Sequence, residues 1–474
     1  MTTPGFDERF SPLLNSGEGR AIILAGGGNF SSCFTCLCSN VLLLPIMSRA
    51  EKLLLFVLAC LNFTHIMDFM IMMPMGPQLM RFFSLSPQQF SFIVSAYSLS
   101  AGISGFLFSF WADRFPRKYI LLVAYSGFVI GTIACGLAPT FTMLVIARTA
   151  AGMFGGVIGA QVLSIVSDTF AYERRAKAMS IVMTAFSVAS VIGVPVGLYL
   201  ATEISWHAPF LVVGGLSLGV IGLVIRYVPL LDGHLRGEQR PSLTRPGPFA
   251  VVTNIWKNPN QMRALWLTST IMLGHFSIIP FISPYLVANV GFGENHLYLI
   301  YAVGGALTIF SAPLVGKLAD QRGKLPVFTV FAVLSLLPIY LITTMPPAPL
   351  PYVLFVAGLF FIFSNGRLIP TQAMTSSVVA PQQRGGYMSI NQSLQLLMQS
   401  VATYGAGLII QKTPSGQLEN YSIVGFLAMA AIFGSIFIAR TVKPVDVTSP
   451  SVGPAPSPLL RKESGDTNVI LLND

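Results

Sequence analysis

The sequence predicts an all-α membrane protein with twelve transmembrane helices in two pseudo-symmetric halves of six, and with both termini in the cytoplasm. Composition is the first reason: 53% of the 474 residues are hydrophobic and only 10% are charged, whereas soluble domains carry about 25% charged residues. The second is a set of twelve apolar runs of about 20 residues, the length of a helix that crosses a bilayer. The third is an internal repeat at a spacing of about 210 residues.

The twelve predicted spans divide the chain into domains. In the first half they cover 53–77, 89–111, 119–138, 141–166, 178–201 and 208–228. In the second half they cover 265–289, 296–316, 325–345, 351–379, 387–410 and 421–440. We therefore expect an N-terminal extension (1–47), a first half (48–228), a cytoplasmic linker (229–263), a second half (264–440) and a disordered cytoplasmic tail (441–474). The extension has no helical period and is interpreted as disordered or as not native, because the residues around Met47 form a more natural start.

The internal repeat rests on markers whose register drifts by only two or three residues. His65 and Pro74 match His275 and Pro284, Asp113 matches Asp320, Arg175–Ser180 matches Arg384–Ser389, and Val196–Leu198 matches Ala406–Leu408. Two equivalent membrane halves are typical of secondary transporters, which rock about a shared central site.

The net charge of +10 resembles that of a nucleic-acid-binding protein, but its distribution indicates membrane topology. Lys and Arg gather in the loops after spans 2, 4 and 8 and in the linker, whereas the opposite loops offer only Arg81 and Lys412. This positive-inside bias directs both termini to the cytoplasm. We therefore expect a lipid bilayer and no nucleic acid among the partners.

Motifs for metal, cofactor or enzyme chemistry are sparse. Cys33-x-x-Cys36-x-Cys38 is the one candidate metal motif, and no His or acidic residue accompanies it. P-loop, H-E-x-x-H and G-x-S-x-G patterns are absent from the sequence. We predict no metal, no cofactor and no enzyme, with a membrane enzyme or sensor as the rival from another class.

Two loop segments carry a family resemblance. Ser109–Lys118 follows span 2 and Gly316–Lys324 follows span 8, and both resemble the G-x-x-x-D-R-x-G-R-R loop of the major facilitator superfamily. The resemblance implies alternating access, with loop charges that hold the two halves together and release them. These gating charges would be Asp113, Arg114, Arg117, Asp320, Arg322 and Lys324. Simple topogenic charge is the other interpretation.

Span 4 contains Arg148 in a segment similar to the superfamily's R-x-x-x-G. Arg148 and Asp68 of span 1 each lie about eight residues from the outer ends of their spans, which puts both about 12 Å deep. A charge at that depth predicts a functional role. Asp68 is the one acidic residue deep in a span, and His65 lies one turn below it. We interpret the three residues as a proton-coupling site, with a static Asp68–Arg148 brace as the alternative; the second-half equivalent of Asp68 is Ile278.

Span 5 contains a predicted helix kink at Gly193, Pro195 and Gly197. The segment resembles the antiporter motif G-x-x-x-G-P-x-x-G-G of the superfamily's exporters, and 206–210 resembles the W-R-x-x-F of drug:proton antiporters. The equivalent stretch of span 11 has no Pro, so the kink is expected in one half only. Both resemblances favour export.

Polar side chains on the spans form a predicted substrate cavity. Lipid cannot satisfy amide groups, so these side chains should face protein or a wet space. For Arg367 two roles stay open: binding an anionic group, or snorkelling and bracing a loop. The predicted cavity residues are Gln161, His275, Arg367, Gln372, Asn391, Gln395 and Gln399.

The resemblance covers about residues 48–440 and identifies the chain as a member of the major facilitator superfamily, most similar to its drug and sugar efflux branch. It implies export of a small molecule by proton antiport, by a monomer in the bacterial inner membrane. An importer or uncoupled facilitator on the same fold is the nearest rival. The sequence does not name the substrate.

Overall fold

The computed structural model describes residues 47–108, 115–170, 172–230, 248–380 and 384–445. Contacts divide the chain into two units, 1–52 and 53–474. In the first unit the described residues include the opening turn of α2 (Arg49–Ile71).

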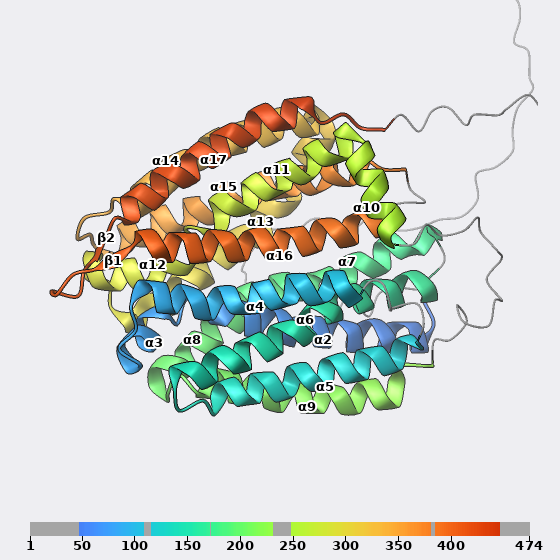
Figure 1. Ribbon diagram of the computed structural model, residues 1–474, viewed down its shortest axis with the longest axis horizontal. Coiled ribbons are helices and arrows are strands. Elements are labelled where there is room, and N and C mark those ends of the chain that lie inside the picture. Colours follow the sequence, from blue (N-terminus) through green and yellow to red (C-terminus); the bar gives the residue numbers. More distant parts are fainter. Residues whose placement is uncertain (1–46, 109–114, 171, 231–247, 381–383, 446–474) are drawn as a thin grey trace, which may run out of the picture. The chain divides into compact units, whose positions relative to one another are not determined.

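The second unit is almost entirely helical and follows the two predicted halves (Figure 1). The helices of the first half are α2, α3 (Gly76–Phe82), α4 (Pro87–Phe108), α5 (Arg117–Gly136), α6 (Phe141–Thr169), α7 (Tyr172–Val188), α8 (Val194–Glu203) and α9 (Ala208–Tyr227). Those of the second half are α10 (Pro248–Lys257), α11 (Pro259–Phe276), α12 (Ile279–Tyr285), α13 (Leu297–Arg322), α14 (Lys324–Thr343), α15 (Leu350–Ser377), α16 (Arg384–Ile409) and α17 (Tyr421–Thr441).

The described residues contain eleven segments long and apolar enough to cross a membrane. The twelfth predicted span is α16, whose 26 residues are about 39 Å long and therefore also long enough. Its amide side chains make it the least apolar of the twelve, which fits a helix covered by protein on two sides: α16 packs on α4 and on α11. The nearly all-helical, twelve-span arrangement in two halves is thus confirmed.

The first span of each half is broken near its outer end. Where the sequence predicts one span over 53–77, α2 ends at Ile71 and a turn precedes α3. Span 7 is likewise divided into α11, α12 and a π-helical turn over Leu286–Val290. Each break coincides with closely spaced prolines, which lack the N–H group that a continuous helix needs.

Span 5 also departs from a regular α-helix, at the predicted kink. A π-helical turn over Ala189–Gly193 separates α7 from α8, and Pro195 lies in the first turn of α8. π-Bulges and prolines are the usual causes of helix bends. The equivalent helix of the second half, α16, is continuous from Arg384 to Ile409. Gly193 and Gly197 lie against the side chains of Met67 and Ile71 of α2.

Two elements had no counterpart in the predicted spans. The predicted linker 229–263 contains α10 and the start of α11, whose Asn258 cap accepts hydrogen bonds from the backbone of Asn260 (3.0 Å) and Gln261 (3.3 Å). Between α16 and α17, the antiparallel strands β1 (Gln411–Lys412) and β2 (Leu418–Glu419) form a short hairpin. The helix α10 and this hairpin are both too short for hydrophobic periodicity to identify.

Small residues set the close packing inside the first half. Gly152 and Gly156 of α6 lie against the backbone of Tyr97 and Ala101 of α4. Gly131 of α5 likewise lies against the backbone of α6. Glycine lets two membrane helices approach this closely. This packing fixes α6, and with it the deep Arg148, between α4 and α5.

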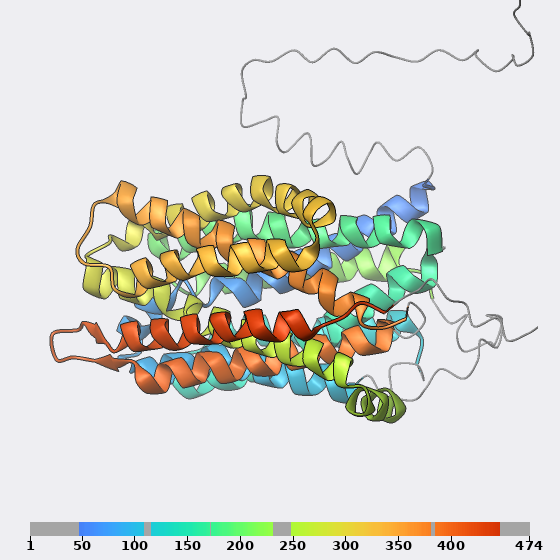
Figure 2. The same ribbon diagram turned by 90° about the horizontal axis from the view of Figure 1, so that it is seen from above.

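The two halves meet along two helix pairs. α4 packs along α16, and the Ser400 hydroxyl donates a 3.0 Å hydrogen bond to the carbonyl of Ser95. On the other side, α13 packs on α8 and on the π-helical turn that precedes it. The first pair can be followed in Figure 2, where α16 is orange and α4 is light blue. The seam between the halves is therefore formed by spans 2, 5, 8 and 11.

Candidate functional site

A buried ion pair lies in the middle of the first half. Arg148 of α6 donates from Nη1 to Oδ2 of Asp68 on α2 at 2.9 Å, and a longer contact of 3.4 Å reaches the Asp68 carbonyl. Both side chains are completely buried. The structure therefore brings together the two charges that sequence depth alone put at one level.

Aromatic rings surround this pair. The Arg148 guanidinium lies over the Tyr97 ring, 4.4 Å from its centroid, in a cation–π contact. His65, the third predicted residue, is half-buried and packs 5.5 Å from Phe128 and 6.5 Å from Tyr97, measured between ring centroids. The pair keeps unused polar capacity, because Asp68 Oδ1, Arg148 Nε and His65 Nδ1 are buried without a hydrogen-bond partner.

A line of rings leads from this site to the second half. Tyr97 lies 5.5 Å from Phe69 of α2, and Phe69 lies 6.5 Å from Phe276 of α11, between centroids. Phe276 in turn contacts His275 at 5.2 Å. Phe69 and Phe276 are only half-buried. They mark the place where the cores of the two halves meet.

The second half contains its own buried cation. Arg367 of α15 is completely buried, donates to Ser335 Oγ at 2.8 Å and reaches His275 Nδ1 at 3.2 Å. Because a guanidinium only donates hydrogen bonds, Nδ1 must be the acceptor, so this His275 is the neutral tautomer with its proton on Nε2. The His275 ring also stacks on Phe360, at 6.1 Å between centroids and an interplanar angle of 6°.

The other predicted cavity residues differ in burial. Gln161, Asn391 and Gln399 are buried, and each keeps one side-chain amide atom without a hydrogen-bond partner. Gln395 is half-buried, whereas Gln372 is exposed. Buried, unsatisfied amides are costly unless something else satisfies them, which is typical of a binding surface.

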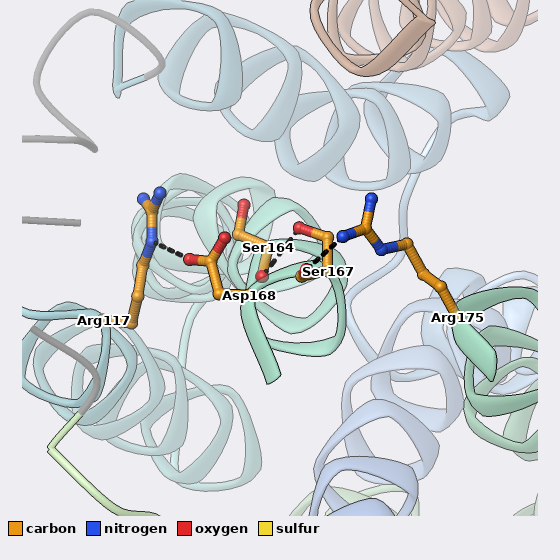
Figure 3. Close-up of polar contacts among 5 residues, drawn as sticks. All are labelled: Arg117, Ser164, Ser167, Asp168 and Arg175. Carbon is orange, nitrogen blue, oxygen red and sulfur yellow. Dashed lines mark hydrogen bonds and ion pairs between the residues drawn. The ribbon is translucent and has the colours of Figure 1, made fainter. Parts of the chain in front are cut away.

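A cytoplasmic cluster includes one of the predicted gating residues. Arg117, at the start of α5, forms an ion pair with Asp168 near the end of α6, with Nε 3.1 Å from Oδ2 (Figure 3). From α7, Arg175 donates to the carbonyl of Ser167 at 2.6 Å. The cluster ties α5, α6 and α7 together within the first half. Asp168 was not predicted; its one signal in the sequence is an acidic residue at the cytoplasmic end of an apolar span.

Of the five remaining predicted gating residues, the structure describes three. Asp113 and Arg114 lie outside the described residues. In the second loop copy, Asp320 and Arg322 are exposed, and Lys324 is the half-buried first residue of α14. Asp320 makes no ion pair with another residue in the part of the chain that the structure describes.

The outer end of the seam is held by contacts between the halves. Arg81, in the last turn of α3, binds both carboxylate oxygens of Glu294, at 2.5 and 2.8 Å. This carboxylate raises the pKa of the Arg81 guanidinium. Beneath it, Phe90 packs edge to face on Phe281 at 5.9 Å between ring centroids. Neither Arg81–Glu294 nor this ring contact was predicted.

The arrangement can hold charge and exchange contacts. Within the described ranges, no group of three His, Cys, Asp or Glu side chains could hold a metal ion. The described core contains an internally compensated ion pair, a cation with neutral neighbours, and a seam of rings and amides between the two halves.

Comparison with known proteins identifies the family of this chain. Residues 58–403 match the model of the Major Facilitator Superfamily. The uncharacterised MFS-type transporter YceJ of Bacillus subtilis (strain 168) is 26% identical over 379 residues, which are 78% of this chain and 92% of YceJ. YwfA, an uncharacterised MFS-type transporter of the same organism, is 24% identical over 296 residues, 61% of this chain and 69% of YwfA.

Solved structures share the fold. A bacterial homologue of the human lysosomal transporter Spinster, inward-facing and unoccupied, superposes with a TM-score of 0.67 at 16% identity, covering 84% of this chain and 98% of that one. The nucleoside transporter NupG superposes with a TM-score of 0.65 at 11% identity, covering 83% and 100%. With twelve spans in two halves and a match over most of its length, the chain belongs to the major facilitator superfamily and is a multi-pass membrane transporter of a small molecule.

Proposed function

We propose that this transporter exports its substrate in exchange for protons, with Asp68 as the proton-carrying group and Arg148 and His65 as its partners. We further propose that it works as a monomer in a bacterial inner membrane, in the drug and sugar efflux branch of the superfamily. The bacterial origin of its relatives supports the location.

The fully buried Asp68–Arg148 pair carries the proposal. A proton on Asp68 would leave Arg148 as an uncompensated buried cation, which is costly. Protonation must therefore be accompanied by a change in what surrounds Arg148, such as movement of Tyr97 or entry of a substrate group. A carboxylate whose proton state and surroundings depend on each other is what coupled transport requires. Its unpartnered Oδ1 leaves one position for such an exchange of contacts.

The direction of transport is proposed from span 5. The π-helical turn and Pro195 lie where the exporters' antiport motif is expected to bend the helix, which supports export. The rival is an importer or uncoupled facilitator, in which the Asp68–Arg148 pair would act only as a brace. An ion pair at hydrogen-bonding distance suits both functions, so transport has to be measured.

Replacing Asp68 by Asn should abolish uphill transport while leaving exchange of substrate across the membrane. The amide cannot carry a proton, but it keeps the shape of the side chain and can still accept from Arg148. The measurement uses proteoliposomes with an inward-directed proton gradient, in which interior pH is followed as candidate compounds are added. In the wild-type protein, one compound class should trigger proton movement, and Asp68→Asn should eliminate it.

The matched control is Glu419→Gln, which neutralises an exposed carboxylate of β2 far from the core. It should transport like the wild type. Compound flux without proton movement in the wild-type protein would refute antiport and favour the facilitator. Proton movement that survives Asp68→Asn would remove Asp68 from the mechanism.

Arg81→Ala should shift the transporter toward its outward-open state by about fivefold or less, because an exposed ion pair contributes about 1 kcal/mol at most. Arg81 and Glu294 join the outer ends of the two halves, and Arg81 is 69% exposed. Spin labels at Leu137 and Pro347, on outer loops of different halves, would report the shift as longer distances in a cysteine-free background. The charge swap Arg81→Glu with Glu294→Arg should restore the wild-type distribution. An unchanged distribution in Arg81→Ala would show that the pair does not contribute to outer closure.

A further inference from the structure

Arg367 is a buried cation without a buried anion. The described residues contain four charged side chains that are buried: Asp68, Arg117, Arg148 and Arg367. Two of the three arginines are paired with carboxylates, Arg148 with Asp68 and Arg117 with Asp168. Arg367 alone has neutral neighbours.

The contacts of Arg367 leave it incompletely satisfied. Its partners are the Ser335 hydroxyl at 2.8 Å and the neutral His275 at 3.2 Å, and its Nε is buried without a partner. Moving a cation from water into a protein interior costs several kcal/mol unless an opposite charge compensates it. Snorkelling does not relieve this cost, because a snorkelling arginine keeps its head group in water, and Arg367 has an exposed fraction of 0%.

The location of Arg367 adjoins the seam between the halves. His275, its hydrogen-bond partner, is half-buried, and the adjacent Phe276 faces Phe69 of the first half at 6.5 Å between ring centroids. His275 and Phe276 are consecutive residues of α11. A molecule that parts Phe69 from Phe276 would therefore lie beside the residue next in sequence to His275, which Arg367 contacts. Rings would surround its body, with Phe360 already stacked on His275.

We propose that Arg367 binds the anionic group of the transported molecule, and that the substrates are therefore carboxylates, sulfonates or phosphates with an apolar or aromatic body. The anion site itself is argued from the contacts of Arg367. Only the identification of the bound anion as the transported molecule rests on the proposed function. The guanidinium offers its fork of N–H groups to a planar or tetrahedral oxyanion. The rings of the seam bind the apolar part, and His275 is displaced from Nη2 or joins the new contact.

The test measures binding and stability on the purified full chain, in neutral detergent without anionic lipid. The probe is benzoate, and benzamide is its uncharged match. Benzoate should raise the unfolding temperature of the wild-type protein in a concentration-dependent manner, and benzamide should not. In Arg367→Met the apparent affinity for benzoate should fall by about tenfold to a hundredfold, the effect of losing hydrogen bonds to a charged group.

The same variant separates a binding cation from a structural brace. Without any anion, Arg367→Met should unfold at a higher temperature than the wild type, because an apolar side chain replaces an uncompensated charge. Arg148→Met, which breaks a compensated pair, should unfold at a lower one. Arg367→Lys keeps the charge and loses the fork, so it should fold and keep a weaker benzoate effect; it decides the question if the Met variant does not fold.

Three results would overturn the proposal: equal effects of benzoate and benzamide on the wild-type protein, a benzoate effect of full size in Arg367→Met, or a loss of stability in that variant as large as in Arg148→Met. None of these involves proton movement. Failure of antiport in the liposome assay would therefore leave the anion site standing, and failure of the anion site would leave antiport standing.

Discussion

Arg148→Met should lower the free energy of unfolding by about 3–5 kcal/mol, because it leaves a buried carboxylate without its cation. The Asp68 carboxylate lies 2.9 Å from Arg148 Nη1, and both side chains are completely buried. The loss should therefore include the desolvation of the orphaned charge as well as one hydrogen bond. Unfolding titrations in mixed detergent micelles would measure it.

The double variant Asp68→Asn with Arg148→Met tests this explanation. It removes both charges, so most of the lost stability should return. Arg81→Met supplies the contrast: that arginine is 69% exposed in its ion pair with Glu294, and its loss should cost about 1 kcal/mol or less. If Arg148→Met proved as mild as Arg81→Met, or if the double variant proved no more stable than the single one, the pair would not be the electrostatic unit described above.

This ion pair was predictable from sequence because a membrane limits the choices of a buried charge. Counting residues from the outer ends of two spans put Asp68 and Arg148 at the same depth. In a medium where an isolated charge is costly, equal depth predicts pairing. The twelve spans follow from equally simple physics, the length of a helix that crosses hydrocarbon. The prediction of the ion pair and that of the spans each needed only distances measured along single helices.

Contacts across the sequence were not predictable in the same way. Arg117 was predicted to be a gating-loop charge, but its ion pair with Asp168, 51 residues away near the end of α6, was not predicted. Arg81 and Glu294 are separated by 213 residues and lie outside the spans. Hydrophobic periodicity tells which face of a helix is buried and nothing about which neighbour covers it. These pairs depend on how whole helices are arranged.

The predicted polar cavity shows the same limit on a smaller scale. Arg367 and Gln372 were both expected to line it, yet they are five residues apart on α15. At about 100° per residue, their side chains point about 140° away from each other. Arg367 is completely buried, and Gln372 is exposed. Sequence identified the helix that carries the polar groups, and the packing of α15 on α11 and α14 determined which of them turns inward.

Gly156→Leu should destabilise the first half by about 3 kcal/mol or more, the upper range for overpacked cores. A Cβ on Gly156 would lie 2.7 Å from the carbonyl carbon of Ala101 and 2.7 Å from Ser104 Oγ, both on α4. Ser104 Oγ could rotate away, but a backbone carbonyl moves only if the whole helix moves. The substitution must therefore separate α4 from α6.

That separation should also affect the ion-pair site. Tyr97 lies one turn from Ala101 on α4, and its ring covers the Arg148 guanidinium of α6 at 4.4 Å. Moving the two helices apart should weaken this contact and reduce transport along with stability. Gly159→Leu is the matched control: it lies one turn away on the same helix, and a Cβ there would meet no atom within 4 Å. Its effect should be neutral or a gain of about 1 kcal/mol from helix propensity. Equal losses in both variants would attribute the effect to leucine itself, and would contradict the close backbone contact as its cause.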